Sequence, residues 1–183
     1  MKHLKFCNGK YYGTLSVILL AFAFFLNLSL SSSEAQSGKT GASGLPIPRF
    51  VSLKSDRVNV RIGPSRDYEI AWTFVRSGLP VEIIQEFDNW RRIRDWEGSE
   101  GWVFHSLLSG RRTALVKPWE ESGNVPIRVT PNSNAPIIAE VEPNVLASVS
   151  ECEVGWCKLS GSDWSGWIDQ SRLFGIYPDE SFN

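Results

Sequence analysis

The sequence predicts an all-β protein made of two tandem copies of one small barrel or sandwich. The stretch Trp90–Val103 has the pattern of a strand, a tight polar turn and a second strand, and this pattern returns over Trp156–Ile168. The two opening tryptophans are 66 residues apart, and Trp102 and Trp167, which follow the closing glycines, are 65 apart. A near-constant offset indicates an internal repeat. Short strands between turns, without sustained helical periodicity, indicate a small β-fold.

The first 35 residues have the pattern of a secretory signal peptide. Three lysines precede an apolar run over residues 15–30, and Ser33 to Ala35 offers small residues where cleavage occurs. We therefore assign residues 1–35 to a signal peptide and expect a periplasmic or secreted protein without a stable membrane span. The alternative is an uncleaved anchor through residues 15–30, but this run is shorter than the about 20 apolar residues of a spanning helix.

The rest of the chain divides by composition and by the repeat. Residues 36–48 are rich in Ser, Gly, Lys, Thr and Pro and carry few apolar groups, which predicts a flexible leader. We assign residues 49–116 to a first domain, 117–178 to a second domain and 179–183 to a tail. Counted from Phe50, the first domain carries 10 basic and 9 acidic side chains, whereas the chain from residue 117 onward carries 4 and 10. The two domains are therefore not expected to contact the same surface.

The first domain contains five short segments with strand character. Val58, Val60 and Ile62 alternate along the first segment, as expected for a half-buried strand, and Gly63-Pro64-Ser65 ends it. Ser106–Leu108 resembles a helical turn, and we expect a closing strand at Thr113–Val116. The five predicted strands cover residues 58–62, 70–75, 81–87, 90–94 and 100–104.

The second domain repeats this order more loosely. Pro126–Asn132 corresponds to Asn59–Ser65, and a turn at Gln170–Leu173 follows the last strand. Because domains of about 65 residues bury only about 60% of their unfolded surface, we expect the two domains to pack together. The remaining predicted strands cover residues 137–141, 144–152, 156–160 and 165–169.

Cys152 and Cys157 are the two cysteines that remain after removal of the signal peptide, which contains Cys7. An oxidising compartment favours a disulfide between them. The chain-entropy model gives about 2 kcal/mol of stabilisation for so short a loop. Two reduced thiols are the alternative.

Val58–Ser65, with the sequence Val-Asn-Val-Arg-Ile-Gly-Pro-Ser, is followed by Gly78, Trp90 and Gly101-Trp102-Val103. Together these residues closely resemble the bacterial SH3 domain family, whose signature is an Asn-Val-Arg-x-Gly-Pro-Ser start and a Gly-Trp-Val finish. Ser106–Thr113, after the last motif, looks like a periplasmic branch of the family whose members carry two such domains.

The resemblance covers Arg49 to Tyr177 but is looser in the second domain, where Pro126, Thr130 and Asn132 replace the Asn, Gly and Ser of the motif. The segment from Glu151 to Cys157 also resembles the periplasmic branch, which supports the disulfide. The resemblance implies two tandem SH3-like β-barrels of about five strands each. It also implies a role in binding, often to cell-wall material or peptides, beside separate catalytic domains.

The residue inventory argues against catalysis and metal binding. One histidine, His105, remains in the exported chain. We interpret it as a surface residue, because no Ser-His-Asp arrangement or Gly-x-Ser-x-Gly elbow accompanies it. Two cysteines without a nearby histidine fall short of the four ligands of a zinc site. We therefore predict no catalytic residue, no metal and no cofactor, and export argues against a nucleic-acid partner.

The aromatic side chains of the first domain are the best signal for a ligand site. Alternation places Ile93 and Val103 in the core and Trp90 and Trp102 on the opposite side, where part of each ring should be accessible. Aromatic walls with a few polar groups are typical of ligand clefts, although these rings would equally well cap the barrel ends or fill the interface between the copies. The candidate ligand-binding residues are Arg61, Tyr68, Trp72, Trp90, Arg92, Trp96 and Trp102.

Two hypotheses for the function follow. The first is an exported, non-enzymatic protein of the cell envelope that binds peptidoglycan or its peptides through these aromatic clefts. The alternative is a periplasmic protein–protein adaptor with a groove for an extended peptide.

Overall fold

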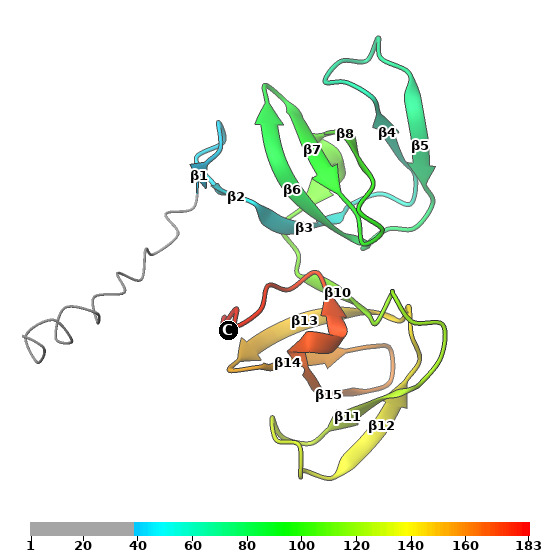
Figure 1. Ribbon diagram of the computed structural model, residues 1–183, viewed down its shortest axis with the longest axis vertical. Coiled ribbons are helices and arrows are strands. Elements are labelled where there is room, and N and C mark those ends of the chain that lie inside the picture. The colour runs from blue at the N-terminus through cyan, green and yellow to red at the C-terminus, as the bar shows by residue number, and fades with distance from the viewer. Residues whose placement is uncertain (1–38) are drawn as a thin grey trace, which may run out of the picture. The chain divides into compact units, whose positions relative to one another are not determined.

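The computed structural model describes residues 39–183, so the predicted signal peptide lies outside the described residues. These residues form strands, turns and two short 3-10 helices, His105–Leu107 and Gln170–Arg172, which confirms the all-β prediction (Figure 1). No helix among residues 39–183 is long and apolar enough to cross a membrane.

The first domain is built on one antiparallel sheet with the strand order β5-β4-β8-β7-β6-β3-β9. The alternation expected from the sequence places Val58 and Val60 in the core, both fully buried, while Asn59 between them faces outward. Ile62, the third residue of the predicted buried face, is 61% exposed, because β4 ends at Arg61. The strands of this sheet are β3 (Arg49–Leu53), β4 (Val58–Arg61), β5 (Ile70–Phe74), β6 (Pro80–Phe87), β7 (Trp90–Arg94), β8 (Glu100–Phe104) and β9 (Leu108–Ser109).

The second domain has the same order, β12-β11-β15-β14-β13-β10-β16. Each strand occupies the place of its counterpart in the first sheet, so the repeat seen in the sequence is a repeat of topology. Ile127, Leu159 and Ile168 are fully buried in a separate core. The strands are β10 (Thr113–Val116), β11 (Val125–Arg128), β12 (Ile137–Val141), β13 (Leu146–Glu153), β14 (Trp156–Ser160), β15 (Ser165–Asp169) and β16 (Leu173–Phe174).

The number of strands differs from the expected five per domain. Each sheet has seven, because an N-terminal strand and a two-residue C-terminal strand extend the edge beside β6 or β13. Within the described residues the outermost strands of each sheet, such as β5 and β9, do not pair with each other. The five strands between β4 and β8 agree with the sequence prediction to within one residue at each end.

The strand Thr113–Val116 does not close the first domain as predicted. It is β10, which pairs with β13 and β16 of the second sheet and runs beside β13 in Figure 1. Its counterpart is β3, which pairs with β6 and β9 in the first sheet. Each domain therefore begins with its own N-terminal strand, which lies second from the edge of its sheet, and the boundary lies before Thr113 rather than after Val116.

The predicted flexible leader is ordered where the structure describes it. Strands β1 (Lys39–Thr40) and β2 (Pro46–Ile47) form a short hairpin. Glu86 holds this hairpin: its carboxylate accepts hydrogen bonds of 2.7 Å from both the amide and the hydroxyl of Ser43, and a third of 2.7 Å from Arg49. The composition of this segment predicted no apolar contact that would hold it. It is held instead by the carboxylate of Glu86, which comes from another part of the chain.

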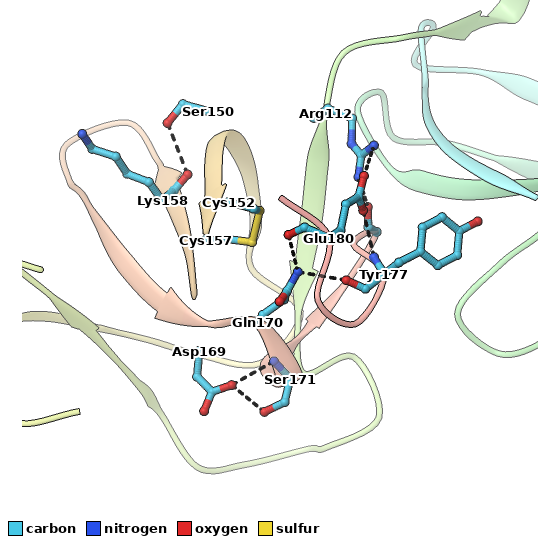
Figure 2. Close-up of a disulfide and its surroundings, with 11 residues drawn as sticks. Arg112, Ser150, Cys152, Cys157, Lys158, Asp169, Gln170, Ser171, Tyr177 and Glu180 are labelled. Carbon is cyan, nitrogen blue, oxygen red and sulfur yellow. Dashed lines mark hydrogen bonds and ion pairs between the residues drawn. A yellow bond between two sulfur atoms is a disulfide. The ribbon is translucent and has the colours of Figure 1, made fainter. Parts of the chain in front are cut away.

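The C-terminal segment packs against the disulfide of the second domain (Figure 2). Cys152 and Cys157 are cross-strand neighbours in β13 and β14 and are joined by a disulfide with a Cα–Cα distance of 4.1 Å, which confirms that prediction. Phe182 forms a β-bridge with Cys152. The Gln170 side-chain amide donates to the carbonyls of Tyr177 and Glu180, at 2.9 and 3.0 Å, so the predicted tail is held in place.

Candidate ligand-binding groove

The outer face of the first sheet carries an open groove of about 380 Å³. Its floor comes from β4, β7 and β8, and its rim comes from the loop after β4 and from the 3-10 helix after β8. The lining residues are Arg57, Asn59, Arg61, Arg66, Trp90, Phe104, Ser106 and Leu107.

Strand alternation explains why these side chains meet. Asn59 and Arg61 point outward because Val58 and Val60, between and beside them, are fully buried. Residue Trp90 of β7 lies directly opposite Phe104 of β8, and their rings pack edge to face with centroids 5.5 Å apart. This geometry is favourable for aromatic pairs and makes a rigid apolar wall.

Cationic groups share the groove with this aromatic wall. The Arg66 guanidinium lies 5.9 Å from the centre of the Phe104 ring, within the range of a cation–π contact. Arg61 is fixed by a 2.5 Å hydrogen bond from its Nη1 to the carbonyl of Tyr68. The lining contains three arginines and no carboxylate, so the groove combines an aromatic wall with an excess of positive charge.

Two of the seven candidate residues, Arg61 and Trp90, line this groove. Trp102 lies across the strand pair from Arg61 and from Arg92, without contributing to the lining. Arg92 forms an ion pair of 2.8 Å with Glu100.

The other three candidates lie elsewhere in the first domain. Tyr68 is 47% exposed and its ring covers Gly63, where a Cβ atom would come within 2.6 Å of it. Trp72 is half-buried and packs edge to face on Phe74 at the margin of the core. Trp96 is 40% exposed in the turn between β7 and β8. The structure therefore does not bring the predicted aromatics together in one cleft.

The accessible part of the Trp90 ring is smaller than the sequence predicts. Trp90 is only 8% exposed. Ile93 and Val103 are fully buried, as predicted, so Trp90 does face away from the core. Phe104 packs on its ring and covers it, and alternation alone does not report such a neighbour.

Sequence reasoning missed most of the groove. The alternation that identified Arg61 also places Asn59 on the same face, and Phe104 follows Trp102 on the outward face of β8. Strand alternation could therefore have identified these two residues from the sequence. Arg57, Arg66, Ser106 and Leu107 come from irregular segments, for which periodicity carries no information.

The groove offers little acid–base or metal chemistry. His105 lies beyond Phe104, with ring centroids 5.0 Å apart, and lines a different cavity. Among residues 39–183, no three His, Cys, Asp or Glu side chains are grouped to hold a metal ion. The arrangement is suited to holding a ligand by stacking and by hydrogen bonds from guanidinium groups.

Comparison with known families explains the repeated sheet. The model of the bacterial SH3 domain matches residues 54–110 and again residues 121–175, which together make up more than half of the chain. The chain belongs to the bacterial SH3 domain family. Each match covers most of one sheet, so each sheet is one SH3 domain, and the first strand of each sheet, β3 or β10, precedes its match.

The chain is similar to a curated protein of Bacillus subtilis (strain 168), "Putative N-acetylmuramoyl-L-alanine amidase YrvJ". The two are 26% identical over 173 residues, covering 91% of this chain and 31% of the relative. The chain therefore spans about a third of that protein's length. Two solved structures, NlpC2 and NlpC1 from Trichomonas vaginalis, align at 13% and 12% identity with a TM-score of 0.32 each. They cover 69% and 74% of this chain, and 48% of each of those chains is covered.

Proposed function

We propose that this protein is a non-enzymatic binding protein of the cell envelope that recognises peptidoglycan through the groove of its first SH3 domain. The observation that carries the proposal is the groove itself, which is lined by the packed rings of Trp90 and Phe104 and by Arg57, Arg61 and Arg66. Aromatic faces stack on sugar rings and on flat peptide groups, and guanidinium groups bind carboxylates with paired hydrogen bonds. Peptidoglycan contains all of these groups.

The relative in Bacillus subtilis supports this ligand class. Its printed name refers to N-acetylmuramoyl-L-alanine, the linkage between the glycan and the peptide of the wall. Family membership supports binding rather than turnover, because the matched regions are the two SH3 domains. A wall-binding role also agrees with the exported location that the N-terminal sequence predicts.

Sedimentation with purified peptidoglycan sacculi tests the proposal. The purified protein should pellet with sacculi at physiological salt, and it should remain in the supernatant without them. Arg57→Ala and Arg66→Ala each remove an exposed guanidinium from the groove. Each should weaken retention roughly three- to tenfold, the range expected for one charge-assisted hydrogen bond.

Arg76→Ala is the matched control, because Arg76 is exposed in the first domain and does not line the groove. Trp90→Ala is a poor probe, since truncating a buried ring would also destabilise the domain. Equal retention of all variants would place the wall-binding site elsewhere. A parent protein that does not pellet would exclude wall binding and leave the peptide adaptor as the function to test.

A further inference from the structure

The second domain contains a groove at the same place as the first. Arg128 pairs with Trp167 as Arg61 pairs with Trp102, and Arg128 donates to the carbonyl of Ala135 at 2.6 Å as Arg61 donates to Tyr68. The cavity has a volume of about 280 Å³. It is lined by Lys117, Asn124, Val125, Pro126, Arg128, Ser133, Trp156, Asp169 and Arg172.

The lining of this second groove differs from that of the first in its charged residues. Asp169 lies opposite Trp156 in the register, where Phe104 lies opposite Trp90 in the first domain. Arg172 takes the place of Leu107: its carbonyl accepts from the Lys117 amide, as the Leu107 carbonyl accepts from the Lys54 amide. Two apolar positions of the first groove are therefore charged in the second.

The basic side chains of the second domain converge on this groove. Lys117, Arg128 and Arg172 are three of the four lysines and arginines in residues 117–183, a stretch that also carries ten acidic residues. An acidic domain that gathers its cations in one concave site has a local potential opposite to that of its surroundings. Such a site attracts an anion, whereas the acidic surface around it repels the same anion.

The partners of these groups leave a cation free for a ligand. Lys117 pairs with Glu120, and the Asp169 carboxylate accepts from the amide and hydroxyl of Ser171 at 2.9 and 2.6 Å. Arg128 donates one of its N–H groups to the carbonyl of Ala135. The guanidinium of Arg172 is exposed and makes no ion pair within residues 39–183.

We propose that the second groove is a separate site for the carboxylate of a short peptide, held by Arg172 and Arg128 beside the Trp156 ring. A planar guanidinium matches a carboxylate with two parallel hydrogen bonds. Asp169 accepts from an amide or ammonium N–H on the same ligand and disfavours a doubly charged phosphate. Both grooves then bind an anionic group through arginines, and the first groove adds the packed ring pair of Trp90 and Phe104. The inference rests on the proposed function only for where the carboxylate comes from. The existence of the site does not depend on it.

Two probes that differ only in charge test the site directly. The dipeptide Ala-Glu, amidated at its C-terminus, and the matched Ala-Gln amide differ in one carboxylate. NMR titration at low salt, followed at the indole N–H of Trp156, should show saturable binding of the Ala-Glu amide. The Ala-Gln amide should bind roughly tenfold more weakly, as loss of a charge-assisted pair predicts.

Arg172→Leu places in the second groove the residue type that the first groove has, and it should weaken binding of the Ala-Glu amide by about fivefold or more. Lys158→Ala is the matched control, since it removes the fourth basic residue of the same stretch, whose amine lies over Trp167 outside the groove. That variant should bind like the parent. Equal affinities for both dipeptides, an absence of saturable shifts, or equal losses in the two variants would overturn the inference.

Retention on sacculi is measured in parallel with the parent protein. If the protein fails to pellet but still selects the Ala-Glu amide, the proposed wall function is wrong and the carboxylate site stands. If it pellets but does not distinguish the dipeptides, the wall function stands and the carboxylate site is wrong.

Discussion

The Tyr177 hydroxyl donates a hydrogen bond of 2.9 Å to Oε1 of Glu82, a residue 95 positions earlier in the chain. Glu82 belongs to β6 of the first domain, and Tyr177 lies in the segment that follows the second sheet. The other Glu82 oxygen accepts from Arg94 at 3.0 and 2.6 Å. The Tyr177 ring also packs against Phe50, with centroids 4.7 Å apart. This contact ties the C-terminal segment to the first SH3 domain.

Replacing Tyr177 with Phe should lower the free energy of unfolding by about 1–2 kcal/mol, because Glu82 loses a donor in a largely buried setting. Urea unfolding at pH 7 measures the change. Tyr68→Phe is the control, since Tyr68 is 47% exposed and should change stability by less than about 0.5 kcal/mol. Equal effects of the two substitutions would show that the Tyr177 contact contributes nothing.

The same contact predicts a loss of stability at alkaline pH. Burial, together with the hydrogen bond to Glu82 and its negative charge, raises the pKa of Tyr177 well above its ordinary value near 10. The folded protein thus retains a proton that the unfolded chain releases. This contribution is complete below pH 10 and declines as the pH rises above it. Thermal unfolding between pH 9 and 11.5 should show a steeper fall in the parent than in Tyr177→Phe, and parallel curves would contradict the assignment.

Glu86 predicts the opposite behaviour in acid. Burial alone would raise the pKa of Glu86, but hydrogen bonds from Ser43 and Arg49 and the charge of Arg91 together lower it to about 2. A depressed carboxylate pKa contributes stability that is present above about pH 4.5 and is lost as the pH falls towards 2. Glu86→Gln should therefore destabilise the protein by about 2 kcal/mol at pH 7.

The difference between Glu86→Gln and the parent should shrink between pH 4.5 and 2. Melting curves at pH 7, 4 and 2.5 provide the measurement. Glu97→Gln, at an exposed residue of the β7–β8 turn, is the control and should leave the curves unchanged. A constant difference at all three pH values would show that folding does not lower the pKa of Glu86.

The disulfide should add about 2 kcal/mol to the stability of the second domain, as the entropy model gives for a short loop. Cys152 is 2% exposed and Cys157 is fully buried, so a thiol reagent should detect no free thiol before unfolding. Dithiothreitol should lower the unfolding midpoint of the parent and leave a Cys152→Ala/Cys157→Ala variant unchanged. Two titratable thiols in the exported, folded protein would contradict the bond.

Glycine is required in both Gly-Trp pairs because two strands approach closely there. A Cβ atom on Gly101 would lie 2.4 Å from Val60 and 3.1 Å from the Arg61 carbonyl, and one on Gly166 would lie 2.6 Å from Ile127. Gly101→Ala should therefore cost about 1–3 kcal/mol through overpacking. Gly110→Ala is the control, since open space surrounds that position. Similar unfolding midpoints for both variants would show that the strands separate without cost.

Much of the fold was predictable from local pattern. The strands and the repeat followed from alternation and from the fixed offset of the tryptophans, and the resemblance to bacterial SH3 domains pointed to the family that the comparison established. The first strand of each domain was less predictable. Val116 and its neighbours have strand character in either domain, and only the pairing of β10 with β13 assigns them to the second.

The groove was predictable only in part, because a groove joins residues from separate segments. Arg61 and Trp90 lie on regular strands, and alternation identified the face on which they lie. Arg66 reaches the groove from a loop, and Arg172 enters the second groove from a 3-10 helix. No periodic pattern predicts where such side chains point.

By itself, the sequence determined the all-β class, the duplication and the pairing of Cys152 with Cys157, because alternation, repeat spacing and short sequence separation are local properties. Tertiary structure alone decided that Glu86 orders the N-terminal hairpin and that Glu82 meets Tyr177. It also decided that three cations of an acidic domain share one groove. These contacts join residues far apart in the chain, and their energies depend on burial and charge that exist only after both sheets have formed.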